Sequence, residues 1–170
     1  MKTVRRILDV ALGAVMSLLL GGMVAVLAWQ VFSRYALNSP SVSSEEILRM
    51  SVVWLSLLGA AYSCGKGTHM SIELLHDLVP GPARRALTML VPVSFIVFAG
   101  GVMIPGGLRA MEIANGQTTA VLRLPMPWIY ASLPVSGTLF VAYSLLNLVD
   151  LVRHRRDQPD EADKLIAAGD

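Results

Sequence analysis

The sequence from Val10 to Phe32 reads VALGAVMSLLLGGMVAVLAWQVF and contains no charged residue. A helix that crosses a lipid bilayer needs about 20 consecutive, mostly apolar residues. Residues 87–108 and 126–149 also meet this requirement without a charged residue. These three stretches therefore predict three transmembrane helices.

A fourth transmembrane helix is predicted over residues 46–65, although Arg49 shortens its uncharged part. An arginine close to a helix end can extend its guanidinium to the membrane surface. Glu45 precedes Arg49 by four residues, and an acid in that position before a base favours a helix. The sequence therefore predicts an all-α integral membrane protein, with four transmembrane helices within residues 1–152 and a charged tail over residues 153–170.

The composition agrees with this fold class. Hydrophobic residues make up 54% of the 170 residues and charged residues only 15%, whereas a soluble domain contains about 25% charged residues. The net charge of +2 gives no reason to expect nucleic-acid binding, because the basic residues cluster beside the apolar stretches. The single cysteine, Cys64, excludes a disulfide within the chain, and we assign it to helix packing.

The distribution of basic residues predicts that both termini are cytoplasmic. Basic residues in short loops mark the cytoplasmic side of a membrane protein. The side that carries both termini holds Lys2, Arg5, Arg6, Lys66, Arg84, Arg85, Arg153, Arg155, Arg156 and Lys164. The other side holds Arg34, Arg49, Arg109 and Arg123. We therefore expect a multi-pass membrane protein whose tail is cytoplasmic.

An alternative interpretation of the first span is a cleaved signal peptide. Basic residues precede the apolar run, and Val26-Leu27-Ala28 is similar to a cleavage site. However, the apolar run is longer than the roughly 7–15 residues of a signal core. We therefore expect the span to be retained as a membrane anchor.

The first span carries a small residue at every fourth position. Gly13, Ser17, Gly21 and Ala25 form this small-residue row, which would let another helix approach closely in a membrane. The second span has a comparable series, Gly59, Ser63 and Gly67, beside Ser56 and Ala60. Two interpretations remain open for these residues: an interface with another subunit, or packing within the chain's own bundle.

The loop before the second span predicts a helix start. Ser43, followed three residues later by Glu46, fits a capping box, and acids favour a helix N-terminus. Two roles therefore remain open for Glu45 and Glu46: capping of the second span, or contact with a partner.

The connection between the second and third spans predicts an interfacial helix over residues 70–79. At about 100° per residue, its apolar side chains fill one side and Glu73, His76 and Asp77 fill the other. Such a segment is too short to cross the bilayer but suits a helix that lies in the membrane surface.

Prolines and glycines in the third and fourth spans predict kinks. Pro92, Pro105 and Pro134 lie in these spans, together with Gly100-Gly101. Aromatic residues mark the outer helix ends, where their rings anchor in the membrane interface; these are Trp29, Trp128 and Tyr130.

The sequence lacks the residues that bond chemistry or ion coupling would need. No Asp, Glu, Lys or His lies in the middle of a span, whereas ion-coupled carriers generally use ionisable or unwound polar groups there. A haem anchor would need histidines inside the helices, but His69, His76 and His154 lie outside them. We therefore expect no enzymatic activity, no cofactor and no metal.

A set of motifs follows the first span in a fixed order. It consists of Arg34, Tyr35, Glu45, Glu46, Arg49, Trp54, Gly59, Ala60 and His69, and later of Leu122–Trp128 at the entry to the last span. This ordered set resembles the small membrane subunit, of the DctQ type, of tripartite ATP-independent periplasmic (TRAP) transporters, and the resemblance covers residues 5–150. The resemblance marks the positions from Arg34 to His69 in this set as a partner interface or structural motif.

The resemblance implies a non-catalytic permease subunit in a bacterial inner membrane. In this family a large multi-span subunit moves the solute with sodium, and a periplasmic binding protein delivers that solute, commonly a carboxylate. The small subunit is then expected to scaffold the large one. The alternative is an anchor or assembly subunit of another inner-membrane complex.

Overall fold

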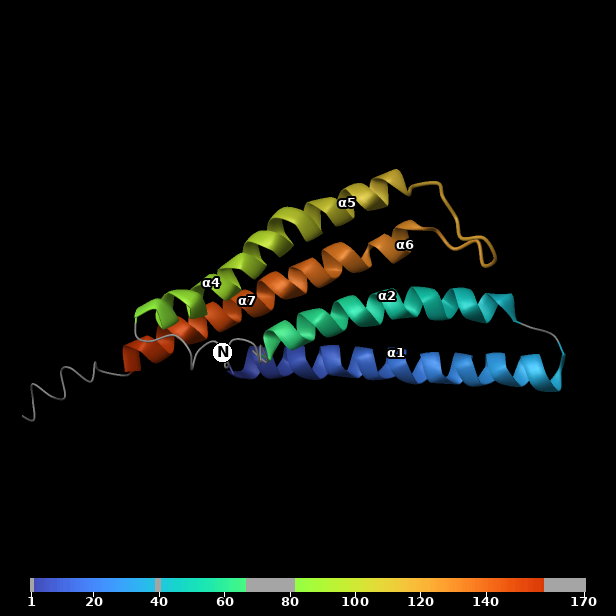
Figure 1. The fold of residues 1–170 in the computed structure, drawn as a ribbon, viewed down its shortest axis with the longest axis horizontal. Helices are drawn as coiled ribbons and strands as arrows, with labels where there is room; N and C mark the ends of the chain where they lie inside the picture. The colour runs from blue at the N-terminus through green and yellow to red at the C-terminus, as the bar shows by residue number, and fades with distance from the viewer. Residues whose placement is uncertain (1, 39–40, 67–81, 158–170) are drawn as a thin grey trace, which may run out of the picture.

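The computed structural model describes residues 2–38, 41–66 and 82–157, which are helical apart from their connections (Figure 1). The elements are α1 (Lys2–Ala36), α2 (Val42–Gly65), α4 (Pro82–Phe98), the π-helix η1 (Ala99–Met103), α5 (Ile104–Ile113), α6 (Pro127–Tyr130) and α7 (Ser132–Asp157). Four stretches are long and apolar enough to cross a membrane: Arg5–Ala36, Val42–Gly65, Met89–Ile113 and Pro127–Asp150. The predicted all-α class with four membrane-length helices is confirmed, whereas the predicted interfacial helix over residues 70–79 lies outside the described residues.

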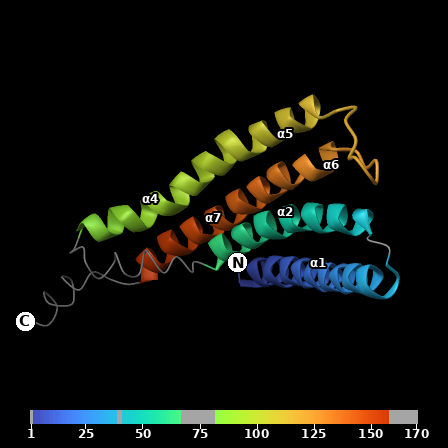
Figure 2. The same ribbon diagram turned by 45° about the vertical axis from the view of Figure 1, so that its right-hand side comes forward.

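The four long helices lie side by side in a single layer (Figure 1; Figure 2). α2 packs against α1 on one side and α7 on the other, and α7 packs in turn against α4, η1 and α5. The last span therefore lies between the second and the third. α1 forms one edge of the layer, and α4 with α5 forms the other.

The two ends of the layer differ in what they hold. The start of α1 and the end of α7 lie together at one end, which we call the terminal end (Figure 1). At the opposite end, the loop end, α1 leads into α2 and α5 leads into α6. α1 ends there because Asn38 adopts a left-handed φ of 49°, which a right-handed helix cannot include.

Buried side chains between neighbouring helices hold the layer together. One cluster joins α2, η1 and α7 through Ala61, Cys64, Ala99, Met103 and Phe140. Phe140 also stacks on Phe95 of α4, with ring centroids 5.8 Å apart. A second cluster joins α1, α2 and α7 through Leu12, Leu58 and Tyr143. Cys64 is thus a packing residue, as expected.

The third span is irregular where the prolines and glycines predict a kink. The backbone N–H of Ile104 donates to the carbonyl of Ala99, five residues earlier, and this bond closes the π-helical turn of η1. Pro105 follows directly and has no N–H to continue the ordinary helical pattern. In the fourth span, the break between α6 and α7 falls at Ala131, three residues before Pro134.

The predicted capping box at the start of α2 is wrong. α2 begins at Val42, so Ser43 lies inside the first turn, and the N-cap is Ser41, which makes no side-chain capping bond. Ser41 instead shares a hydrogen bond of 2.7 Å with the Ser44 hydroxyl. Because α2 begins earlier than predicted, Glu46 does not cap it. The Glu46 carboxylate instead binds the loop between α5 and α6. At the other end of the chain, α7 continues to Asp157, into the predicted tail.

Candidate functional site

The carboxylate of Glu46 holds the loop between α5 and α6 against α2. Its Oε2 accepts hydrogen bonds from two consecutive backbone N–H groups, those of Val121 (3.1 Å) and Leu122 (3.0 Å). The buried Thr119 belongs to the same loop. Hydrogen bonds to an ionised group are stronger than neutral ones, so Glu46 connects the beginning of the second span to a segment 75 residues later.

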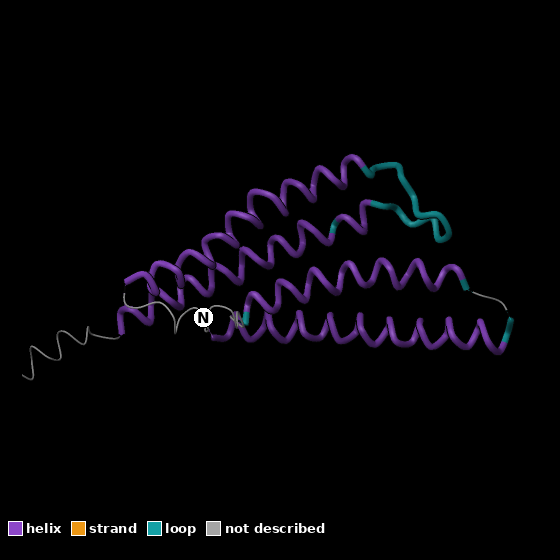
Figure 3. Tube along the Cα trace, in the orientation of Figure 1, coloured by secondary structure: helices purple, strands orange, loops and turns teal. Residues whose placement is uncertain are grey.

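The loop itself doubles back at the loop end of the layer (Figure 3). Thr119 N–H donates to the Leu124 carbonyl (2.9 Å), and Leu124 N–H donates to the Thr119 hydroxyl (3.0 Å). Met126 N–H donates to the Gln117 carbonyl (3.0 Å) and closes the loop at its base. Arg123 turns the chain with a left-handed φ of 51°. Glu46 therefore binds a loop that already has a defined shape.

Replacement of Glu46 by alanine is expected to release this loop while leaving the four helices in place. The amides of Val121 and Leu122 lose their acceptor, so hydrogen–deuterium exchange in residues 117–126 should rise about tenfold. Glu46→Gln keeps an acceptor oxygen and should have a smaller effect. Glu45→Ala is the matched control, since Glu45 pairs with Arg49 on the exposed side of α2. Equal exchange in the Glu45 and Glu46 variants would contradict the assignment.

Glu45 and Arg49 form the predicted ion pair on the exposed side of α2. The Arg49 Nη2 lies 3.1 Å from the Glu45 Oε1, and the two side chains are 78% and 63% exposed. Such an exposed pair contributes little to stability, so both groups remain available to a charged ligand. Beside them a cavity of about 370 Å³ lies between α2 and the loop, with Val53 and Met126 among its lining residues.

A second polar cluster, at the terminal end, was not predicted. Arg5 of α1 donates to the Gly65 carbonyl, and Asn147 of α7 donates to the Cys64 carbonyl at 3.1 Å. These carbonyls belong to the last two residues of α2, where the helix has no following turn to bind them. Arg5 also pairs with Asp150 at 3.4 Å. The end of α2 is therefore bound by both neighbouring helices.

The buried Tyr143 completes this cluster. Its hydroxyl donates to the Asp9 carboxylate at 2.9 Å and so connects α7 to α1. Just beyond α2, the Lys66 ammonium lies 4.8 Å from the Tyr62 ring centroid, and a hydrogen bond to Tyr62 raises the pKa of Lys66. A sequence signal existed for the cluster: Tyr143, Asn147 and Asp150 follow each other at i, i+4 and i+7, which places them on one side of a helix.

Within the small-residue row, Ser17, Gly21 and Ala25 lie on the exposed side of α1 that faces away from α2, and Gly13 lies on the flank. The residues of α1 that pack toward α2 and Tyr143 are Leu8, Leu12, Met16 and Leu19. Counted from Leu12 at about 100° per residue, Gly21 points to the opposite side. A Cβ added at Gly13 or Gly21 would meet no atom of the described chain within 4 Å. Packing inside the chain's own layer therefore does not occupy these two glycines.

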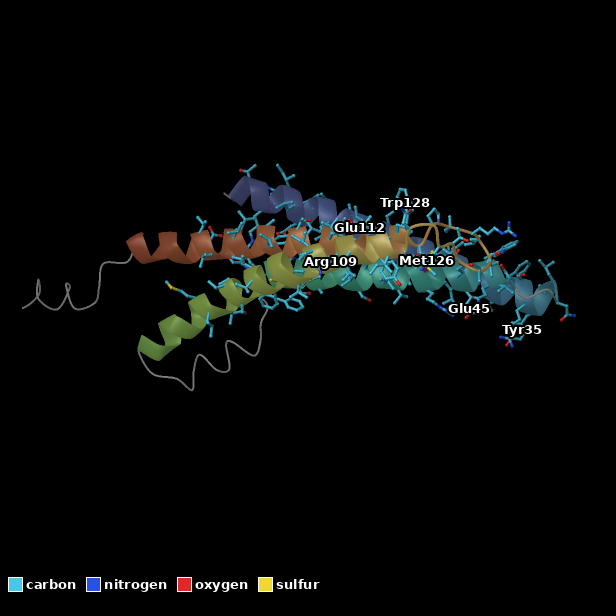
Figure 4. The ribbon with its side chains drawn as sticks, turned by 90° about the horizontal axis from the view of Figure 1, so that it is seen from above. Tyr35, Glu45, Arg109, Glu112, Met126 and Trp128 are labelled. Carbon is cyan, nitrogen blue, oxygen red and sulfur yellow. The ribbon has the colours of Figure 1, made fainter. Side chains whose placement is uncertain are left out.

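The remaining predicted site residues do not gather in one place. Arg34 and Tyr35 are exposed at the end of α1, and Figure 4 shows Tyr35 with Glu45 toward the loop end. Trp54 packs beside the cluster of Leu12, Leu58 and Tyr143. Gly59 faces α1, since a Cβ added there would lie 4.0 Å from the Met16 sulfur. Ala60 is exposed, and His69 lies outside the described residues.

The described helices and loops contain no group of three or more His, Cys, Asp or Glu side chains placed to hold a metal ion. The polar side chains instead connect helix ends to one another or to the loop. These features define a small helical membrane protein with four spans, arranged as an open layer.

Comparison with known proteins assigns the chain to a family. The family model for tripartite ATP-independent periplasmic transporters, DctQ component, matches residues 23–154. The chain therefore belongs to the DctQ family of small TRAP transporter permease subunits, which are non-catalytic.

Individual relatives agree with this assignment. The chain is 30% identical over 135 residues to the sialic acid TRAP transporter small permease protein SiaQ of Vibrio cholerae, covering 79% of this chain and 78% of that protein. It is 26% identical to the C4-dicarboxylate TRAP transporter small permease protein DctQ of Rhodobacter capsulatus, covering 72% and 57%. It is also 29% identical to the sialic acid TRAP transporter permease protein SiaT of Haemophilus influenzae, covering 68% of this chain but only 19% of that longer protein.

Proposed function

We propose that this small permease subunit is a fixed scaffold that widens the stationary part of a large TRAP membrane subunit. The observation that carries the proposal is the small-residue row, which forms an open edge of the layer at Gly13 and Gly21. Small residues at a helix surface allow close packing with another membrane helix. The large subunit would pack along this edge of α1.

The protein would lie in the bacterial inner membrane with both termini in the cytoplasm. The excess of basic residues around the termini supports this orientation. The start of α1 and the end of α7 lie at the same end of the layer, as such a topology requires (Figure 1). The loop end, with Glu46 and its bound loop, would then face the periplasm and the solute-binding protein.

The complex would take up an organic carboxylate by coupling to sodium. The relatives in Vibrio cholerae and Rhodobacter capsulatus are named for sialic acid and C4-dicarboxylates, and both solutes carry carboxylate groups. The middle of each span in this chain has no Asp, Glu, Lys or His. The solute and ion sites would therefore belong to the large subunit, and this chain would contribute fixed membrane surface.

Uptake should require the complete set of proteins. With the large subunit in proteoliposomes and the binding protein added outside, we expect sodium-driven accumulation of a radiolabelled carboxylate. Vesicles that contain this chain alone should accumulate none, because it has no coupling groups inside its spans. Uptake by the large subunit at an undiminished rate without this chain would contradict the scaffold role. Stable co-purification with a different inner-membrane complex would instead support an anchor or assembly subunit.

A further inference from the structure

We propose that the cavity between α2 and the loop binds one acyl chain of a zwitterionic phospholipid, whose headgroup pairs with Arg49 and Glu45. The cavity of about 370 Å³ is large enough for a small-molecule site. Its apolar lining comes from both sides, from Val42, Met50 and Val53 of α2 and from Val121 and Met126 of the loop with Ile129 of α6. This proposal goes beyond the scaffold role and does not depend on it.

The apolar part of the cavity fits within one leaflet of a bilayer. Along α2 the lining runs from Val42 to Val53, with the charged pair at the level of Glu45. The eight residues from Glu45 to Val53 advance about 12 Å along the helix, which is less than half of the roughly 30 Å hydrocarbon core. Trp128, 72% exposed, lies at the same end of the layer, where aromatic rings mark the membrane interface (Figure 4).

The chemistry of the cavity selects the occupant. Most of the lining is apolar, and an acyl chain can cover such a surface without polar partners. At the edge, the exposed Arg49 and Glu45 carry opposite charges 3.1 Å apart. A phosphate suits the Arg49 guanidinium, and an ammonium group suits the Glu45 carboxylate. Phosphatidylethanolamine carries both groups beside its acyl chains, whereas phosphatidylglycerol carries the phosphate but no ammonium group to pair with Glu45.

Photo-labelling tests the site in the assembled complex. Nanodiscs would contain phosphatidylethanolamine with a diazirine in its acyl chain, or phosphatidylglycerol with the same chain. We expect the phosphatidylethanolamine probe to label peptides that contain Val53 or Met126. Val53→Phe, which fills the cavity, and Arg49→Gln, which removes the phosphate partner, should each reduce labelling about fivefold or more. Glu45→Gln should shift labelling toward phosphatidylglycerol.

Two controls separate this site from general lipid contact. Arg109→Gln and Glu112→Gln remove exposed charges near the same end of the layer, on α5, and should leave labelling unchanged (Figure 4). Equal labelling of the parent, Val53→Phe and Arg49→Gln proteins would overturn the proposal. If the Val53→Phe protein no longer binds the large subunit but is still labelled by the lipid probe, the proposal is overturned. The cavity would then hold a side chain of the large subunit. Because Arg49 is exposed, its variant stays informative if Val53→Phe does not fold.

Discussion

A Gly107→Ala protein is expected to lose the contact between the third and fourth spans. The new Cβ would lie 2.5 Å from the Pro134 Cδ and 2.9 Å from the Pro134 nitrogen, and neither the ring nor the backbone can rotate away. Overpacking of this kind costs about 1–3 kcal/mol. We therefore expect the midpoint of thermal unfolding in detergent to fall by about 4–8 °C.

The neighbouring glycine provides the control for this substitution. A Cβ at Gly106 would meet no described atom within 4 Å, and Gly106 is exposed on the outer side of α5. Gly106→Ala should unfold at the temperature of the parent protein. Equal midpoints for the Gly106 and Gly107 variants would show that α5 does not pack on α7 as described.

Replacement of Gly21 by leucine is expected to prevent assembly while the small subunit itself stays folded. The leucine side chain would stand on the open edge of α1, where the large subunit is proposed to approach closely. We expect the amount of large subunit that co-purifies to fall about tenfold, in line with an overpacking cost of 1–3 kcal/mol. Carboxylate uptake should fall with it.

Gly22→Leu is the matched control for this assembly defect. Gly22 is also exposed, and a Cβ there meets no described atom within 4 Å, but it points about 100° away around the helix. Both variants should unfold at the parent temperature, because neither position contacts the rest of the layer. Co-purification that is normal with Gly21→Leu, or equally weak with both variants, would place the interface elsewhere.

The sequence predicted each span from length and apolarity, because the bilayer imposes those two properties on any helix that crosses it. It also predicted the Glu45–Arg49 pair, because residues four apart on a helix are neighbours. Both are local or solvent-imposed features. The irregular third span belongs with them, since Pro105 removes a donor at a known position.

The order of the helices could not be predicted in the same way. In lipid, the side of a helix that faces another helix and the side that faces acyl chains are both apolar. The side of α1 that packs toward α2 is therefore no more hydrophobic than its exposed side. The packed side carries Leu8, Leu12, Met16 and Leu19, and the exposed side carries Leu18 and Val24. Because both sides are apolar, hydrophobic periodicity does not show that α7 lies between α2 and α4.

Polar contacts between distant residues were also missed or misassigned. Glu46 fits a capping box in sequence, but the helix begins earlier and its carboxylate binds Val121 and Leu122 instead. Asp9 and Tyr143 lie 134 residues apart, and nothing in either segment alone marks the hydrogen bond between them. Such contacts depend on which helices become neighbours, which is the property that the sequence pattern leaves open.

A photo-crosslinking scan along α1 in the assembled transporter tests the scaffold most directly. Cysteines would replace Ser17 and Ala25 of the small-residue row, and Val15 and Gly22 on the flank, in a Cys64→Ala background. Each would carry the same thiol-linked benzophenone. The proposed interface predicts adducts with the large subunit at Ser17 and Ala25 and none at Val15 and Gly22. Adducts confined to the flank, or absent from all four positions, would contradict it.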